Sequence, residues 1–165
     1  MSNWFYDDES GRYVLKGARI LFPNFSGEEQ DYNQAGKRNF RLVLPVDMAE
    51  ELKSRGVFVR DRPDRDNPDE SIYLVKVGIY PDADIRLKFG GKLHPLSVND
   101  FDVVDSEFRK GHVINGNLDV EFHVSRNTRV MTDNRYARVD TMIIPIRKSR
   151  LLDDYEDAID DELPM

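Results

Sequence analysis

The stretch HVINGNLDVEFHV, residues 112–124, shows the strongest period-two alternation in the chain. This pattern predicts a β-strand with one face on a core and the other face in solvent. The inward set is Ile114, Leu118, Val120, Phe122 and Val124, and the outward set is Asn115, Asn117, Asp119, Glu121 and His123. Gly116 interrupts the inward set, which indicates a bulge or a sharp bend in the strand.

Similar alternation predicts strands elsewhere in the chain. They cover residues 17–22, 38–44, 57–60, 72–80, 84–89 and about 135–146. In the last of these, two sets of side chains compete for the inward face: Val139, Thr141 and Ile143 against Met142, Ile144 and Ile146.

One short helix is predicted at DMAEELKSR, residues 47–55, because Asp47 can cap its first turn and Gly56 can end it. A second region, residues 97–111, is ambiguous, and we expect a loop there with a helical turn near residues 105–108. With so little helix, the chain is mainly β, and a small closed or nearly closed antiparallel barrel fits best. A jelly roll or a two-sheet sandwich is the alternative. Helices do not alternate with strands, so we expect no parallel sheet.

The charge of the chain is divided between a neutral body and an acidic end. The chain has 31 Asp and Glu against 24 Lys and Arg, and seven of the acids lie within residues 153–162. The other 24 acids balance the basic residues, so the net charge of -7 belongs to the tail. We therefore expect one domain at residues 1–152 and an acidic, disordered tail with an apolar tip at residues 153–165.

Several function classes are disfavoured by composition. The chain has no Cys, which excludes disulfides and thiolate metal sites. Its three His would have to converge with a carboxylate to hold zinc, so we expect no metal and no cofactor. It shows no signal peptide and no membrane span, so we expect a cytoplasmic protein. No catalytic constellation is visible, so we expect a binding protein and not an enzyme.

Basic and aromatic side chains share the outward face of two consecutive predicted strands. They are Lys76, Tyr80, Arg86 and Lys88, and they would cluster if the two strands form a hairpin. Cations follow the backbone of single-stranded nucleic acid while aromatic rings stack on its bases, so this combination favours such a ligand. The alternative, for any one of these residues, is that it only keeps the surface of the protein soluble.

Two stretches resemble a known family. GARILFPNFSGEEQDYNQAGKRNFRLVLP, residues 17–45, is similar to the start of bacteriophage single-stranded-DNA-binding proteins of the OB-fold type. DDYEDAIDDELPM, residues 153–165, is similar to the acidic C-terminal peptide of bacterial and phage members, although Met165 stands where the family usually has an aromatic residue.

The resemblance implies a protein that coats single strands during replication or recombination and recruits other proteins through its tail. Carried over by position, the DNA-binding residues of the barrel face would be Arg41, Lys76, Tyr80, Arg86 and Lys88. Arg126, Arg129 and Arg135 would bind DNA from the loop between the last two long strands. Arg38 and Asn39 belong to the matching motif, either as DNA-binding residues or as structural ones. The partner-binding tip would be Asp160, Asp161, Glu162, Leu163, Pro164 and Met165. A membrane partner is not expected, and association between copies of the chain stays open.

Two other classes remain as alternatives. One is a virion or assembly protein whose acidic tail binds a basic partner. The other, less favoured, is a magnesium-dependent nuclease that uses carboxylates such as Asp119, Glu121 and Asp140.

Overall fold

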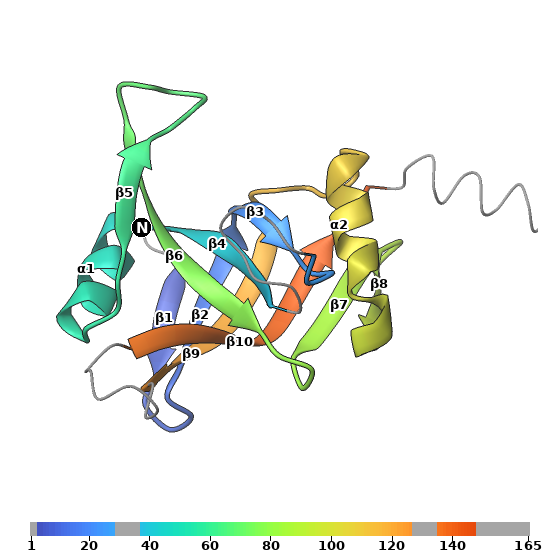
Figure 1. Cartoon of the computed structure of the whole chain (residues 1–165), viewed down its shortest axis with the longest axis horizontal. Helices are drawn as coiled ribbons and strands as arrows, with labels where there is room; N and C mark the ends of the chain where they lie inside the picture. The colour runs from blue at the N-terminus through green and yellow to red at the C-terminus, as the bar shows by residue number, and fades with distance from the viewer. Residues whose placement is uncertain (1–2, 29–36, 127–134, 148–165) are drawn as a thin grey trace, which may run out of the picture.

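The computed structural model describes residues 3–28, 37–126 and 135–147, and they form a curved, mainly β fold with two α-helices (Figure 1). The strands are β1 (Trp4–Asp7), β2 (Arg12–Ala18), β3 (Ile20–Asn24), β4 (Arg38–Leu44), β5 (Arg60–Pro63), β6 (Ser71–Ile79), β7 (Asp84–Phe89), β8 (Lys92–Leu96), β9 (Leu118–Arg126) and β10 (Arg135–Pro145). The helices are α1 (Val46–Ser54) and α2 (Asp102–Arg109), with a short 3-10 turn at Val98–Asp100 before α2. The mainly β class is confirmed.

All ten strands belong to one sheet that is not closed into a barrel. Its main path runs β1-β2-β9-β10-β6-β4-β3, while β5 pairs with β6, and β7 pairs with β10 and β8. The expectation of purely antiparallel pairing is wrong, because β10 pairs in parallel with both β6 and β7. The long connection from β7 to β10, which includes β8, α2 and β9, provides the crossover that parallel pairing requires.

Strands β6 and β7 do not form the hairpin that the sequence suggested. Each pairs with β10, β6 near residue 138 and β7 from residue 141 onward, so they lie one after the other along the same strand. Their outward faces therefore continue one surface, but Lys76 and Arg86 are not cross-strand neighbours.

Both of the alternation phases that compete in the last predicted strand occur in β10, each in a different part of the strand. A register shift between Val139 and Thr141 marks a bulge in β10. Val139 is inward before the bulge and Met142 is inward after it, as are Ile144 and Ile146. The extra residue, Asp140, reverses the alternation, which is why neither phase fitted the whole strand.

Other boundaries also differ from the sequence prediction. β9 begins at Leu118 and not at residue 112, because the chain turns at Gly116, whose φ is 106°. Asn115 lies in this turn, where its side chain accepts a hydrogen bond from Ile20 N (2.9 Å) and donates one to Ile20 O (2.8 Å). The predicted strand at 17–22 is split between β2 and β3, and β1 and β8 were not predicted.

The core lies between the inner face of the curved sheet and the two helices, with α1 near β5 and β6 and α2 near β3, at the opposite end (Figure 1). Aromatic rings dominate it: Tyr13 stacks on Phe122 with centroids 5.4 Å apart, and Phe25 stacks on Phe40 at 5.8 Å. Trp4, in β1, packs against this core.

Both helices differ in detail from the prediction. α1 begins one residue early, after Pro45, and Asp47 accepts a hydrogen bond from Met48 N instead of capping the helix. Proline, with its fixed φ, takes the N-cap position, and no side chain caps there. The ambiguous region forms a complete second helix, α2, so the expectation of one short helix is wrong. Neither helix in the described residues is long and apolar enough to cross a membrane.

The Pro23-Asn24-Phe25 motif builds the corner after β3. Asn24 Oδ1 accepts hydrogen bonds from the backbone N–H of Gly27 (3.0 Å) and Glu28 (3.1 Å). From α2, buried Asp105 accepts hydrogen bonds from Phe25 N and Ser26 N, both at 2.9 Å. This part of the family-like stretch therefore has a structural role, which is to tie the end of β3 to α2.

Replacing Asp105 should test this tie. Asp105→Ala leaves the N–H of Phe25 without its acceptor in a buried position and removes the acceptor of Ser26 N. We expect the free energy of unfolding in urea to fall by about 2–4 kcal/mol. Asp102→Ala is the matched control, because that carboxylate is exposed on the same helix. Equal stability of the two variants would contradict the assignment.

Candidate nucleic-acid interface

The outward face of the sheet collects the polar side chains of the central strands. On β4 and β6 the register places Arg41 opposite Lys76 and Asn39 opposite Gly78. In β10, Arg138 pairs with the same Gly78 from the other side. These strands therefore bring residues from three distant parts of the chain onto one surface.

Arg41 and Lys76 form a pair of like charges at the centre of this surface. Burial lowers the pKa of Arg41, and the charge of Arg60 lowers it further. Lys76 is exposed but partly desolvated, and this partial desolvation is the largest cause that lowers its pKa. The charges of Arg41 and Lys37 lower it further. Arg41 Nη1 is buried and has no hydrogen-bond partner among the described residues. A nearby anion would stabilise the charged form of each of these side chains, so this arrangement is suited to bind an anion.

Strand β5 adds two arginines that sequence reasoning missed. Arg60 lies opposite Leu74 and Arg62 opposite Ile72 on β6, and alternation places these positions on the same face as Lys76. The prolines and mixed charges around them indicated an exposed loop. The alternation of Arg60 and Arg62 across Asp61 was the one local signal that could have identified a strand.

Phe22 is a second residue that sequence reasoning missed. It lies in edge strand β3 at a register shift between Leu21 and Asn24, and the residue is 49% exposed. Its φ is 52°, a left-handed conformation that costs a non-glycine residue about 1–2 kcal/mol. The Arg62 guanidinium carbon lies 5.4 Å from the centre of its ring.

Tyr80 lies on the predicted face, with one side of its ring covered. The Arg138 guanidinium carbon is 3.9 Å from the ring centre, and Arg138 Nη2 donates to Asp82 at 2.9 Å. Gly78 makes room for the ring, since a β-carbon there would come within 3.2 Å of it. The hydrogen bond from Arg138 lowers the pKa of Asp82.

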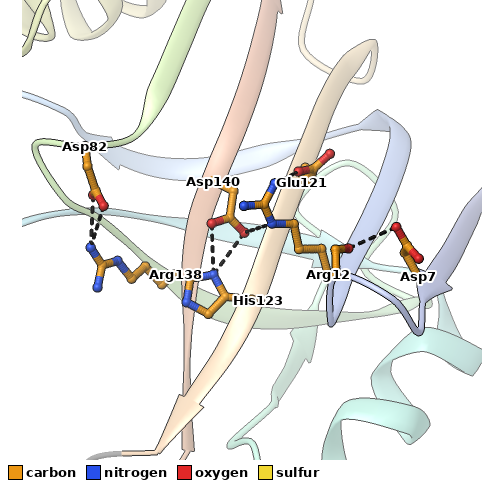
Figure 2. Close-up of polar contacts among 8 residues, drawn as sticks. Asp7, Arg12, Asp82, Glu121, His123, Arg138 and Asp140 are labelled. Atoms are coloured by element: carbon orange, nitrogen blue, oxygen red, sulfur yellow. Dashed lines mark hydrogen bonds and ion pairs between the residues drawn. The ribbon is translucent and has the colours of Figure 1, made fainter.

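Most of the remaining outward basic side chains on β2, β7 and β9 contact carboxylates. Arg86 donates twice to Asp84, which precedes it by two residues on the same strand, with both distances 2.9 Å. Figure 2 shows the second group, in which Arg12 contacts Glu121 at 2.8 Å and His123 contacts Asp140 at 2.9 Å.

These contacts also place the carboxylates of the nuclease alternative. Glu121 and Asp140 are neighbours of cations (Figure 2), and Arg12 Nε lies 3.6 Å from Asp140. In the described part of the chain, no group of three His, Asp or Glu side chains could hold a metal ion.

The other predicted residues are spread more widely. Arg38 does not lie on the same face of the sheet as Arg41. Its side chain packs toward the core, with the guanidinium carbon 6.0 Å from the Phe101 ring centre. Lys88 is exposed on β7, near the far end of β10. The backbone of Arg135 pairs with that of Arg126, and Arg135 alternates to the face opposite Arg138.

Several predictions fall outside the described residues. They concern the Arg126 side chain, Arg129, and the tail tip at residues 160–165. These stay predictions.

Comparison with known proteins identifies the family that this chain resembles. Residues 8–85 match the model of the family described as "Putative phage ssDNA-binding domain". This range contains Phe22, Arg41, Arg62 and Lys76, and it ends just before Arg86. Among curated proteins, none matches the sequence significantly.

Solved structures show the same likeness in fold. A C-terminal truncation of the single-stranded DNA-binding protein from bacteriophage Enc34 has a TM-score of 0.57 and 12% identity, over 88% of this chain and 91% of that chain. The structure of that phage protein in complex with ssDNA has a TM-score of 0.53 and 14% identity, over 88% and 92%. A further structure of the Enc34 protein has a TM-score of 0.52 and 13% identity, over 87% and 85%. The resemblance to phage single-stranded-DNA-binding proteins is confirmed, and the OB-like fold is consistent with it.

The unpaired charges of the surface lead to a prediction about stability. A lowered pKa means that folding disfavours protonated Lys76, so this residue destabilises the fold at neutral pH. The penalty disappears as the pH rises past the ordinary lysine value of 10.5. Lys76→Met should therefore raise the melting temperature at pH 7, by the equivalent of no more than about 1 kcal/mol because solvent screens the exposed charge.

Calorimetry at pH 7 and at pH 11 checks this expectation, with Lys88→Met as the matched control on β7. The gain from Lys76→Met should shrink at the higher pH. A lower melting temperature for this variant at pH 7 would contradict it.

Proposed function

We propose that this chain binds single-stranded DNA, without sequence preference and without catalysis, along the outward face formed by β3, β4, β5 and β6. The observation that carries the proposal is the set of cations on this face, centred on Arg41 and Lys76, that has no carboxylate partner among the described residues.

Electrostatics gives the reason why a phosphate chain suits this face. Desolvation lowers the pKa of both Arg41 and Lys76, and repulsion from neighbouring cations, Arg60 for Arg41 and Arg41 with Lys37 for Lys76, lowers each further. A phosphate bound beside them would offset both effects. Binding would release counterions from the strand, so affinity should depend strongly on salt. The acid-balanced part of the sheet, around Glu121 and Asp140, would attract phosphate less, which directs the strand toward β4 and β6.

The comparisons support the nature of the ligand. The matched family is described by ssDNA binding, and one similar structure is a complex with ssDNA. The face also carries aromatic rings at Phe22 and Tyr80, and rings stack only on bases that are not already paired and stacked in a duplex. We therefore favour single strands over duplex.

The proposed role is to coat single strands during phage replication or recombination in the cytoplasm of the host cell. Residues 153–165 would act as a tethered polyanion that competes with DNA for the cations of the face. When DNA binds, the freed tip would recruit a replication or recombination protein. Its acids would speed association, and Leu163, Pro164 and Met165 would give specificity.

Titration of labelled oligonucleotides tests the DNA-binding face. Arg41→Ala and Lys76→Ala should each weaken binding to single strands of any sequence. Each should also make the slope of log affinity against log salt shallower by about 0.7, the value for one lost phosphate contact. Fluorescence anisotropy at several salt concentrations measures both effects. Lys110→Ala is the matched control, since Lys110 is exposed just after α2 and belongs to none of these strands.

Wild-type protein should prefer a single strand to a duplex of the same length. Equal or tighter binding to duplex would count against the proposal. Absence of binding at low salt would favour the virion or assembly alternative.

Truncation after Leu152 tests the tail. Removing seven acids should tighten binding to single strands, most clearly at low salt, where screening is weakest. The same anisotropy titration at low and high salt provides the measurement. Unchanged affinity at low salt would mean that the tail does not compete with DNA.

A further inference from the structure

Phe22 has an exposure and a backbone conformation that packing does not explain. Its ring is half exposed, while its φ of 52° is a conformation that L side chains rarely adopt. The bulge in β3 places Phe22 and Pro23 opposite a single residue of β4, and this turns the Phe22 side chain out of the strand's regular alternation. Strain of this kind persists where the surrounding structure imposes it, and it is concentrated at functional sites.

The ring lies at the border of the unpaired cations. Its neighbour Leu21 is the register partner of Arg41. Arg62, two residues from Arg60 on β5, places its guanidinium group 5.4 Å from the ring centre. The loop after β5 is tied to the same edge, because Arg19 Nη1 lies 3.5 Å from Asp64 Oδ1 and Arg19 Nη2 lies 3.6 Å from Asp66 Oδ2.

From this geometry we infer that Phe22 is a stacking platform for one nucleobase, with Arg62 as its positioning residue. The inference rests on the proposed function and names a subsite within it. A base on the Phe22 ring would place the adjoining phosphates near Arg41 and Lys76. Because every base has a π-face, such a platform adds affinity without sequence preference.

Other exposed aromatic rings fit this role less well. Arg138 already covers Tyr80 at 3.9 Å, and Asp82 holds that arginine in place. Phe5 lies opposite Val14, whose other neighbour is Glu121, on the acid-balanced part of the sheet. Phe58 is more exposed than Phe22 and makes a useful reference ring.

Fluorescence provides the direct test. The chain has one tryptophan, Trp4, whose buried indole nitrogen has no hydrogen-bond partner in the described residues, so Trp4→Phe loses no such bond. In that background, Phe22→Trp should be quenched when poly(dT) is added, whereas Phe58→Trp should not. An unquenched Trp at position 22 under conditions of full binding would overturn the inference.

Affinity provides the second test. Phe22→Leu keeps an apolar side chain and removes the ring, so binding to a dT oligomer should weaken about 5- to 100-fold. On an abasic oligomer of the same length, the variant and the wild type should bind equally. A Phe22→Leu variant that binds dT like wild type, or loses as much affinity on the abasic strand, would overturn the inference.

A stability measurement separates stacking from a structural role. Phe22→Gly relieves the positive φ, so its melting temperature should equal or exceed that of wild type while its affinity falls. A lower melting temperature would assign the ring to packing and overturn the inference. If wild-type protein binds no oligonucleotide, the proposed function itself fails. If wild type binds and the Phe22 variants behave like it, only the platform is wrong.

Discussion

The pairing of β10 with three other strands is the interaction on which the rest of the sheet depends. β9 lies along one side of it, and β6 and β7 share the other. A regular strand would keep one phase throughout, yet β10 must direct Val139 and Met142 into the same core. The bulge at Asp140 resolves this conflict. A deletion or insertion of one residue there would exchange the inward and outward side chains of half of the strand.

Charge is distributed unevenly over the surface that this sheet presents. On β2 and β7, carboxylates stand beside Arg12 and Arg86, and such pairs cost little because each member compensates the charge of the other. Around Arg41 and Lys76 the compensation is missing. A face that carries uncompensated cations is less stable alone than with an anion. This division distinguishes the proposed binding surface from the rest of the sheet more clearly than the net charge of the chain does.

The sequence predicted what depends on short-range periodicity. The outward positions of Arg41, Lys76 and Lys88 follow from alternation within single strands, and α1 follows from its own pattern. Pairing between distant strands was not predictable in this way, so β6 and β7 were taken for a hairpin. Phe22 was missed because a bulge, which depends on the partner strand, sets its direction. The ion pair between Arg86 and Asp84 could have been predicted from the sequence, because Asp84 is two residues away on the same face of the strand.

An open sheet has edges, and the edge at β3 is poorly suited to receive another strand. Pro23 has no N–H to offer, and the bulge beside it breaks the row of backbone groups that a further strand would need. At a further edge of the sheet, β8 carries Pro95, which has the same effect. If the chain coats single strands as proposed, many copies on one DNA strand would meet at high local concentration. Blunted borders of this kind would keep neighbouring copies from fusing their sheets into aggregates, so that crowding remains reversible.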